Sequence, residues 1–398
     1  MTGGRLAIGP VEYESRPVGV DKSLSCVTLG LYLLSSPDGP AAILIHGDAE
    51  RGPRSPDVIV DVIAANAGHA EVVLADLRRR ARELNVYRRQ MFSLGPGANP
   101  FGQNSLGVTF HPRPQVGRED IVLPADVLER VERLILDIGR SRELLLRAGR
   151  HLKRGLLLHG PPGVGKTLTV RYLATEMADA TIIVLSGAAI GAITTSCTMA
   201  RELAPSVVVV EDVDLIAQDR SMPGQHGQPL LFQLMNEIEG IADDADVAFI
   251  LTTNRAEVLE PALAARPGRV DLAISLERPD AAARQQLIDL YGRGLELDVS
   301  DWSEFIARTD GVTPAFIKEW LRSAVLRARD PGGLGRDELE SALDELLGEA
   351  NALTRVLLGG AVERAAEAGV RFPGADRLPS HLGWMPGAAS ARREIDND

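Results

Sequence analysis

Residues 160–167 read Gly-Pro-Pro-Gly-Val-Gly-Lys-Thr, between the apolar stretch GLLLH and the helical pattern LTVRYLATEM. Glycines in such a turn let consecutive backbone N–H groups point at phosphates beside a helix N-terminus. Lys166 can reach the β- and γ-phosphates, and the Thr167 hydroxyl can bind Mg²⁺. A plain turn between strand and helix would explain the glycines, but not Lys-Thr at this position. The stretch therefore predicts a phosphate-binding loop.

The nucleotide-binding residues expected from this loop are Gly160, Pro161, Pro162, Gly163, Val164, Gly165, Lys166, Thr167 and Leu168.

A second pattern runs from four valines, residues 207–210, into the acids Glu211, Asp212 and Asp214. A central parallel strand, covered on both faces, explains the valines. Acids that merely end a strand in solvent are one interpretation. At the carboxyl edge of a parallel sheet, however, one carboxylate can hold a metal while its neighbour polarises the attacking water. The nearby phosphate loop favours this second interpretation.

With these motifs the chain resembles the AAA family of ring-forming ATPases over roughly residues 119–330. GPPGVGKT is similar to its Walker A motif, VVVVEDVD to its Walker B motif, and FILTTN, which ends at Asn254, to its first sensor strand. EPALAARPGRVD is similar to the stretch that carries two arginines, here Arg266 and Arg269. The later GVTPAFIKEWLRSAVLRA is similar to the helix of the small lid domain.

The resemblance implies an ATP hydrolase that uses ATP and Mg²⁺ and forms a homo-oligomeric ring, expected to be a hexamer, acting on a protein client. The implied metal ligands are Thr167 and Glu211, and the implied catalytic residues are Asp212, Asn254, Arg266 and Arg269. Arginines three apart can project from a subunit edge and neutralise charge on a neighbour's γ-phosphate. A solvated loop without a partner is the alternative for these two arginines.

Two departures from the family pattern bear on function. The Walker B acids usually run Asp-Glu, whereas Glu211 precedes Asp212 here. Shortening the base by one methylene moves its carboxylate by about 1.5 Å, which leaves slow turnover open. The same order, with RPGRVD, resembles the mitochondrial AAA translocase of a folded iron–sulfur protein, which implies that a Glu-Asp pair supports hydrolysis. In addition, residues 186–205 lack the aromatic residue of a threading pore loop, which favours remodelling of folded partners.

The elements that must position these residues form an α/β fold. We expect a P-loop NTPase parallel sheet wrapped by helices, then a helical lid, with a separate small N-terminal α/β domain. The predicted divisions are an N-terminal domain (1–92), a Gly/Pro/Asn-rich linker (93–117), the large ATPase subdomain (118–293), the lid and C-terminal helices (294–371) and a loose tail (372–398).

Within these divisions the periodicity predicts several particular elements. The N-terminal domain should have strands near 26–34 and 41–46, a helix from about 58 and a strand at 71–75. One long amphipathic helix should span 124–146, and helices should cover 300–307, 313–328, 336–349 and 351–368. An arginine-rich window, 78–89, is most simply a solvated helix face.

Composition narrows the function classes. The formal net charge of −12 and 4% aromatic residues make nucleic acid an unexpected partner. Two cysteines, no secretion signal and no apolar run of membrane length predict a cytoplasmic protein without a membrane partner. A nucleic-acid-associated motor or clamp-loader-like protein, and a slow nucleotide-gated scaffold, remain as alternatives. A small-molecule kinase would leave Asn254 and the paired arginines without a role.

Overall fold

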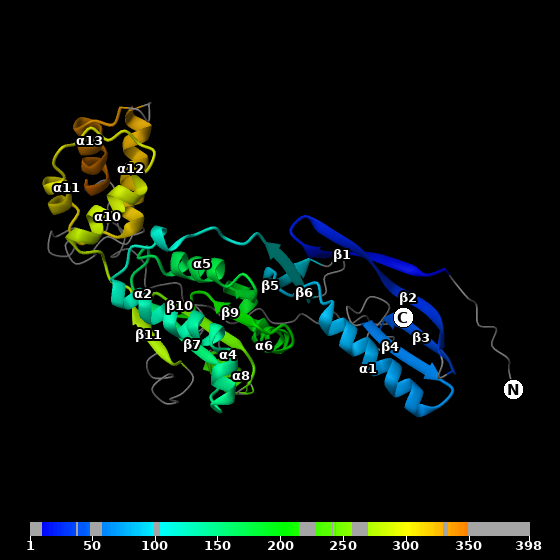
Figure 1. Cartoon of the computed structure of the whole chain (residues 1–398). Helices are drawn as coiled ribbons and strands as arrows, with labels where there is room; N and C mark the ends of the chain where they lie inside the picture. The colour runs from blue at the N-terminus through cyan, green and yellow to red at the C-terminus, as the bar shows by residue number, and fades with distance from the viewer. Residues whose placement is uncertain are drawn as a thin grey trace, which may run out of the picture.

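A computed structural model describes residues 10–36, 39–47, 58–98, 104–214, 228–240, 242, 244–256, 270–328 and 333–348. Figure 1 shows three bodies along the chain: a small sheet with one helix in blue, a larger sheet wrapped by helices in cyan and green, and a helical bundle in yellow and orange. The predicted fold class is therefore confirmed. No helix in the described ranges is long and apolar enough to cross a membrane.

The central body is a seven-stranded sheet in the order β11-β7-β10-β9-β8-β5-β6. All neighbouring strands are parallel except β6, which runs antiparallel to β5. The valine run forms β9, and all its residues are buried, as expected for a strand covered on both faces. The strands are β5 (Met91–Ala98), β6 (Asn104–His111), β7 (Arg154–His159), β8 (Thr181–Leu185), β9 (Ser206–Val210), β10 (Val247–Thr253) and β11 (Leu272–Ser275).

Helices cover both faces of this sheet. One core, which includes Leu185, Ile193 and Phe249, lies beneath α6 and α8. The other, which includes Val131, Ile135 and Leu173, lies beneath α2 and α5. The helices are α2 (Ala125–Glu132), α3 (Ile138–Arg140), α4 (Arg142–Arg147), α5 (Lys166–Glu176), α6 (Ile193–Glu202) and α8 (Gln228–Glu239), with short 3₁₀ turns at Arg118–Asp120 and Gly187–Ala192.

The single long helix predicted over 124–146 is wrong in one respect, because the segment is broken. A π-helical turn, Arg133–Asp137, follows α2, and α3 ends at a turn centred on Ser141 before α4 begins. The π turn coincides with a tertiary contact: the buried Arg154 side chain donates its Nε hydrogen to the Ile135 carbonyl. A distant arginine therefore supplies a hydrogen bond where the regular helical pattern is interrupted.

The linker predicted over 93–117 is wrong for most of its length. Residues 91–98 and 104–111 form the antiparallel strands β5 and β6, and β5 pairs with β8 from Met91 to Ser93, which extends the central sheet. Phe92 and Leu94 are fully buried there. Proline is tolerated at position 96 because β5 pairs with β8 only as far as Ser93. Pro96 therefore does not need an amide hydrogen on the side that faced β8.

The N-terminal body is an antiparallel sheet in the order β1-β2-β3-β4 with one helix. Its elements are β1 (Glu12–Gly19), β2 (Lys22–Ser36), β3 (Gly39–Gly47), β4 (Val58–Ala64) and α1 (Ala67–Glu83). The helix predicted from about 58 and the strand predicted at 71–75 are both wrong, since their order is reversed. Alternating Val58, Val60 and Val62 pair with β3, and the Asn66 side chain then caps α1.

The arginine-rich window divides into two parts. Arg79 and Arg80 lie on α1 and pair with exposed acids such as Asp76, in agreement with a solvated face. Arg88 differs: its guanidinium donates to the carbonyls of Glu202 and Ala204, at the C-terminal end of α6. This arginine therefore links the end of the N-terminal body to the central one.

The helical bundle consists of α10 (Ala281–Tyr291), α11 (Ser303–Arg308), α12 (Pro314–Ala328) and α13 (Arg336–Leu347). Trp320, Phe305 and Phe316 fill its core. The predicted boundary at 293 is wrong, because Leu287 and Ile288 of α10 belong to this core. The chain leaves the sheet after β11, and Asp280 caps α10 as a bundle helix. The predicted helix at 351–368 and the tail at 372–398 lie outside the described residues.

Candidate nucleotide-binding site

The phosphate-binding loop joins β7 to α5 with a backbone that requires glycine. Gly160, Gly163 and Gly165 have φ angles of +143°, +81° and +105°. A Cβ atom on Gly160 would lie 2.2 Å from the carbonyl oxygen of Leu276, which follows β11. The sequence therefore uses glycine where the chain turns steeply into a helix N-terminus, which leaves backbone amides free to face an anion.

Lys166, the first residue of α5, folds back across this loop. The side chain is buried, and its Nζ donates to the carbonyls of Gly160 and Pro161 at 2.8 Å each. Burial lowers the pKa of Lys166, and the carboxylates of Asp212 and Asp214 oppose that shift. A phosphate at the loop would supply the nearby negative charge that this buried ammonium needs.

Glu211 lies beside Thr167, as expected of two metal ligands. Burial and the neighbouring Asp212 carboxylate raise the pKa of Glu211, while Arg171 and a hydrogen bond with the Thr167 hydroxyl lower it. A hydroxyl and a carboxylate are the oxygen ligands that Mg²⁺ takes beside nucleotide phosphates. The donor set therefore fits Mg²⁺, and a cation here would relieve the unfavourable charge on Glu211.

Asp212 and Asn254 come together at the ends of β9 and β10. Asp212 has a φ of +51°, and its backbone N–H donates to the Thr252 hydroxyl. The Asn254 amide donates to the Asp212 carboxylate at 3.1 Å. The left-handed backbone turns the Asp212 side chain to this edge, where it lines the cavity described below. Glu211 does not line that cavity.

Asp214, the third acid of the predicted strand end, has a supporting place. It is buried and accepts hydrogen bonds from the Thr253 hydroxyl at 2.8 Å and from the Asn254 backbone N–H at 3.3 Å. It therefore fixes the turn that presents Asn254. The motif placed an acid here, but only the packing of β9 beside β10 gives it this role.

These residues face a cavity of about 360 Å³ at the joint between the central sheet and the bundle. Besides the loop, Asp212, Thr252 and Asn254, its lining includes Asp120, Ile121, Val122, Leu123, Leu287, Tyr291, Pro314, Ala315 and Lys318. The Ala315 backbone N–H donates to the Gly163 carbonyl at 3.2 Å, which joins the bundle to the loop. The sequence predicted none of this second set as site residues. The stretch similar to the lid helix contains Pro314, Ala315 and Lys318, but these residues meet the loop only when the bundle docks.

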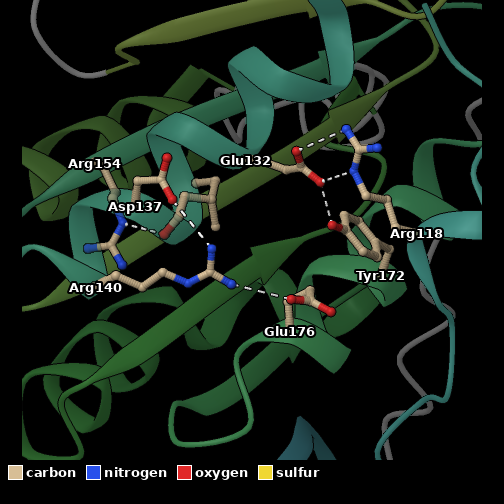
Figure 2. A network of polar contacts seen from close by, with 8 residues as sticks. Arg118, Glu132, Asp137, Arg140, Arg154, Tyr172 and Glu176 are labelled. Carbon is tan, nitrogen blue, oxygen red and sulfur yellow. Dashed lines mark hydrogen bonds and ion pairs between the residues drawn. The ribbon is translucent and has the colours of Figure 1, made fainter. Parts of the chain in front are cut away.

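A separate polar network includes Tyr172 and Glu176, which lie farther along α5 than Lys166 (Figure 2). The Tyr172 hydroxyl donates to Glu132, which also pairs with Arg118, and Arg140 bridges Asp137 and Glu176. A hollow of about 390 Å³ is lined by these side chains and their neighbours. It lacks the glycine-rich turn of the nucleotide site. Arg266 and Arg269, the predicted fingers, lie outside the described residues.

In the central sheet, β7 leads into α5 through a Gly-rich loop with Lys-Thr, and acids follow the nearby strand β9. This arrangement defines a P-loop nucleotide-binding domain. A model of the family "ATPase family associated with various cellular activities (AAA)" matches residues 156–278. This part of the chain is thus an AAA family ATPase domain, and ATP and Mg²⁺ are the cofactors of such a domain.

Curated relatives agree with this assignment. The ATP-dependent zinc metalloprotease FtsH 2 of Sphaerobacter thermophilus is 32% identical over 270 residues, covering 62% of this chain and 41% of the relative. The chloroplastic FTSH 1 of Oryza sativa subsp. japonica is 27% identical over 358 residues, covering 80% and 51%. This chain spans about half or less of the length of these two relatives. The resemblance to the mitochondrial translocase subgroup stays a prediction.

The names of these relatives raise the question of a zinc site. None of the seven histidines in this sequence begins the pattern His-Glu-x-x-His, which binds zinc in metalloproteases. Among the described residues, no group of three or more His, Cys, Asp or Glu side chains is placed to hold a metal. Thr167 and Glu211, the predicted Mg²⁺ ligands, supply only one acid between them and so fall outside that criterion.

Proposed function

We propose that this protein is an Mg²⁺-dependent ATP hydrolase that assembles into a homo-oligomeric ring, expected to be a hexamer, and remodels a protein or protein complex. The observation that carries the proposal is the meeting of Lys166, Asp212 and Asn254 around one cavity, with Glu211 beside Thr167 at its edge. A kinase for small molecules would not need Asn254 bonded to the second acid of the strand end.

The residues divide the work of phosphoryl transfer. Loop amides and Lys166 bind the terminal phosphates and stabilise the charge that develops on them. Thr167 and Glu211 hold Mg²⁺, which neutralises phosphate charge when bound. The Asp212 carboxylate accepts the hydrogen bond of the attacking water, and the Asn254 amide keeps that carboxylate in place. Arg266 and Arg269 of a neighbouring subunit complete the site.

The client is proposed to be a folded protein held by the N-terminal body. Residues 186–205 carry no aromatic side chain for gripping an extended polypeptide, and they form a 3₁₀ turn and α6. The names of the relatives support two parts of this proposal, namely dependence on ATP and action on proteins. Proteolysis is not part of the proposal. A cytoplasmic location is proposed because Cys26 and Cys197 are both unpaired thiols.

Mixing two defective subunits tests the ring and its shared site. Arg269→Ala protein and Lys166→Ala protein should each lack ATPase activity alone. Mixed, they should regain part of it, because some interfaces pair an intact loop with an intact arginine, and an arginine supplied in trans contributes on the order of 10³-fold. Arg266→Ala is tested in the same way. Arg147→Ala, which removes an exposed arginine of α4, serves as the control and should be active alone.

No recovery in mixtures that demonstrably co-assemble would reject the arginines as fingers.

The role of Asp212 has its own test. Asp212→Asn should bind ATP normally and release phosphate about 10²-fold or more slowly. Release at the wild-type rate would place the water-polarising group elsewhere. An absence of phosphate release by the wild-type ring would instead favour the nucleotide-gated scaffold, and stimulation by DNA or RNA would favour the nucleic-acid motor.

A further inference from the structure

The sheet of the N-terminal body is apolar on both of its faces. Residues 31–34 of β2 read Leu-Tyr-Leu-Leu, and β4 reads Val-Ile-Val-Asp-Val-Ile-Ala. An antiparallel sheet with one face in water commonly alternates apolar and polar residues. These strands do not alternate, so the face turned to water carries apolar side chains.

The strand register shows which apolar side chains share a face. Leu33 and Ile63 both pair with Ala42, and Leu31 pairs with Leu44. Paired residues lie on the same face of a sheet, and so do residues two apart in one strand. We call the resulting set the open face; its large apolar members are Leu31, Leu33, Leu44, Ile59 and Ile63.

The open face is exposed, whereas the opposite face is covered. Leu33 is 79% exposed and Ile63 is 68% exposed, and only Leu44 of the set is half-buried. On the opposite face Ala41 and Ile43 are buried, and α1 lies along the sheet (Figure 1). In the part of the chain that the structure describes, nothing gives the open face a comparable cover. An exposed apolar patch of this kind marks an interaction surface.

The open face also carries little charge. Its one acid, Asp61, forms an ion pair with His46 at 2.9 Å. The other charged side chains of this sheet lie on β1 and at Lys22, the first residue of β2. Because the whole chain has a net charge of −12, two copies repel each other over most of their surface. The open face is where they can approach at least cost.

A flat apolar sheet face is complementary to a second copy of itself. Two sheets pack face to face about 10 Å apart with interdigitating side chains. Three strands about 4.8 Å apart and seven residues long give a flat footprint of roughly 350 Å², and protruding side chains add to the accessible area. That size is at the low end of specific interfaces. The expected pair is therefore weak and forms at micromolar concentrations.

The N-terminal body is held against the central one. The Arg88 guanidinium donates to the carbonyls of Glu202 and Ala204. The Tyr87 ring stacks on Phe110 of β6, with 5.6 Å between the ring centroids. A surface that is already fixed in place loses less freedom on binding than one on a flexible tether. These contacts therefore favour pairing through the open face.

We propose that the open face binds the open face of a second copy of this chain. The contact is two-fold, so each copy supplies the same residues. Such a contact differs from the rotational contact that builds a ring, and it forms with or without a ring. The inference goes beyond the proposed function and does not rest on it. The client would contact another surface of the N-terminal body.

Cross-linking of the full-length protein without nucleotide tests this pairing. Leu31→Cys is introduced beside Cys26→Ser, so that the one remaining native cysteine, Cys197, is buried. A short bismaleimide spans sheets about 10 Å apart, so this protein should give a covalent dimer at micromolar concentrations. Leu34→Cys in the same background is the matched control. Leu34 is an exposed leucine of β2 that pairs with Ala41 on the opposite face, so it should give about tenfold less dimer.

Two aspartate variants should break the pair from different strands. Leu33→Asp and Ile63→Asp, each added to the Leu31→Cys protein, place a carboxylate in the apolar contact, where its burial is unfavourable. Each should lower the yield of cross-linked dimer about tenfold or more. Melting temperatures should stay near that of the parent, because both side chains are exposed in the single chain. Leu144→Asp, at an exposed leucine of α4, should change neither measurement.

Every other outcome would overturn the proposal. One such outcome is the absence of a dimer from Leu31→Cys, and another is an equal yield from Leu34→Cys or from both aspartate variants. A dimer that forms only when the chain ends at residue 348 would assign the open face to residues 349–398 of the same chain. Binding of reduced, carboxymethylated lactalbumin that Leu33→Asp abolishes, without any dimer, would assign the open face to an unfolded client.

Discussion

Two regions along α5 carry charge in opposite ways. In the polar network farther along the helix, the acids have cationic or hydroxyl partners: Glu132 pairs with Arg118 and Tyr172, and Glu176 pairs with Arg140 (Figure 2). At the N-terminal end, Glu211 and Asp212 are consecutive acids, and Lys166 is bonded to two carbonyls rather than to a carboxylate. The network is complete as it stands, whereas the N-terminal end holds charge that a ligand would neutralise.

This difference separates stability from function. The paired charges of the network are partly exposed, and their loss should lower stability slightly without changing ligand binding. The charges at the N-terminal end are partly buried at some cost, which is typical of binding and catalytic sites. Substitutions in the two regions should therefore affect different measurements.

The largest effect on binding is expected for Lys166→Ala. Loss of a charged donor to the terminal phosphates should weaken ATP binding about 100-fold or more and abolish hydrolysis. Stability should not fall, because burial lowers the pKa of Lys166 and the folded protein holds the charged form at a cost. Calorimetric titration and thermal melting measure both. Full ATPase activity in the folded variant would reject the assignment of the loop.

The largest effect on stability is expected for Arg154→Met, at a buried ion pair between the start of β7 and the residue before β10. Arg154 is 1% exposed and donates to the Asp246 carboxylate at 2.7 Å. The variant leaves a buried carboxylate unpaired, which should cost about 3–5 kcal/mol of unfolding free energy in urea denaturation. Changing Asp246 to Asn as well should restore part of that stability. If Arg154→Met instead weakened ATP binding at unchanged stability, paired charges outside the site would not be separable from ligand binding in this way.

A smaller loss of stability is expected for Tyr172→Phe. The variant deletes the hydroxyl that donates to Glu132 but leaves Glu132 paired with Arg118. It should cost about 1 kcal/mol in the same denaturation experiment. The dissociation constant for ATP should stay at the wild-type value. A clear change in ATP affinity would show that the network transmits its state through α5 to the loop.

The smallest effect, and one of opposite sign, is expected for Glu211→Gln. Because the pKa of Glu211 is raised, the folded protein binds a proton here more tightly than the unfolded chain. Its stabilising contribution is complete below the usual value of 4.5 and is lost as pH rises through the raised pKa. Without ligand, the variant should melt above wild type at pH 7.5, and the difference should shrink toward pH 5.

The same Glu211→Gln variant should gain less stability than wild type from Mg²⁺ with ATP. Glu143→Gln, at an exposed acid of α4, is the matched control and should melt like wild type at each pH. A melting temperature for Glu211→Gln below that of wild type at pH 7.5 would contradict the origin of the raised pKa in burial.

The sequence by itself determined the centre of the site, because the residues that form it are close neighbours in the chain. The phosphate loop is set by a strand, three glycines and Lys166-Thr167 within a short stretch, and a buried strand ending in acids is recognisable from its valines. The helices of the bundle also follow from periodicity, and α11, α12 and α13 begin within three residues of their predicted positions. These features depend on neighbours in the chain, which a sequence displays directly.

Features that depend on distant partners were decided only by the tertiary structure. Residues 91–98 and 104–111 contain Gly and Pro like a linker, yet they form strands of the central sheet, where Phe92 and Leu94 enter a core that β8 also lines. The supporting role of Asp214 requires β10 beside β9, and the place of Lys318 at the nucleotide cavity requires the bundle docked on Gly163. Each of these contacts joins residues from separate elements, and its free energy exists only once those elements have packed together.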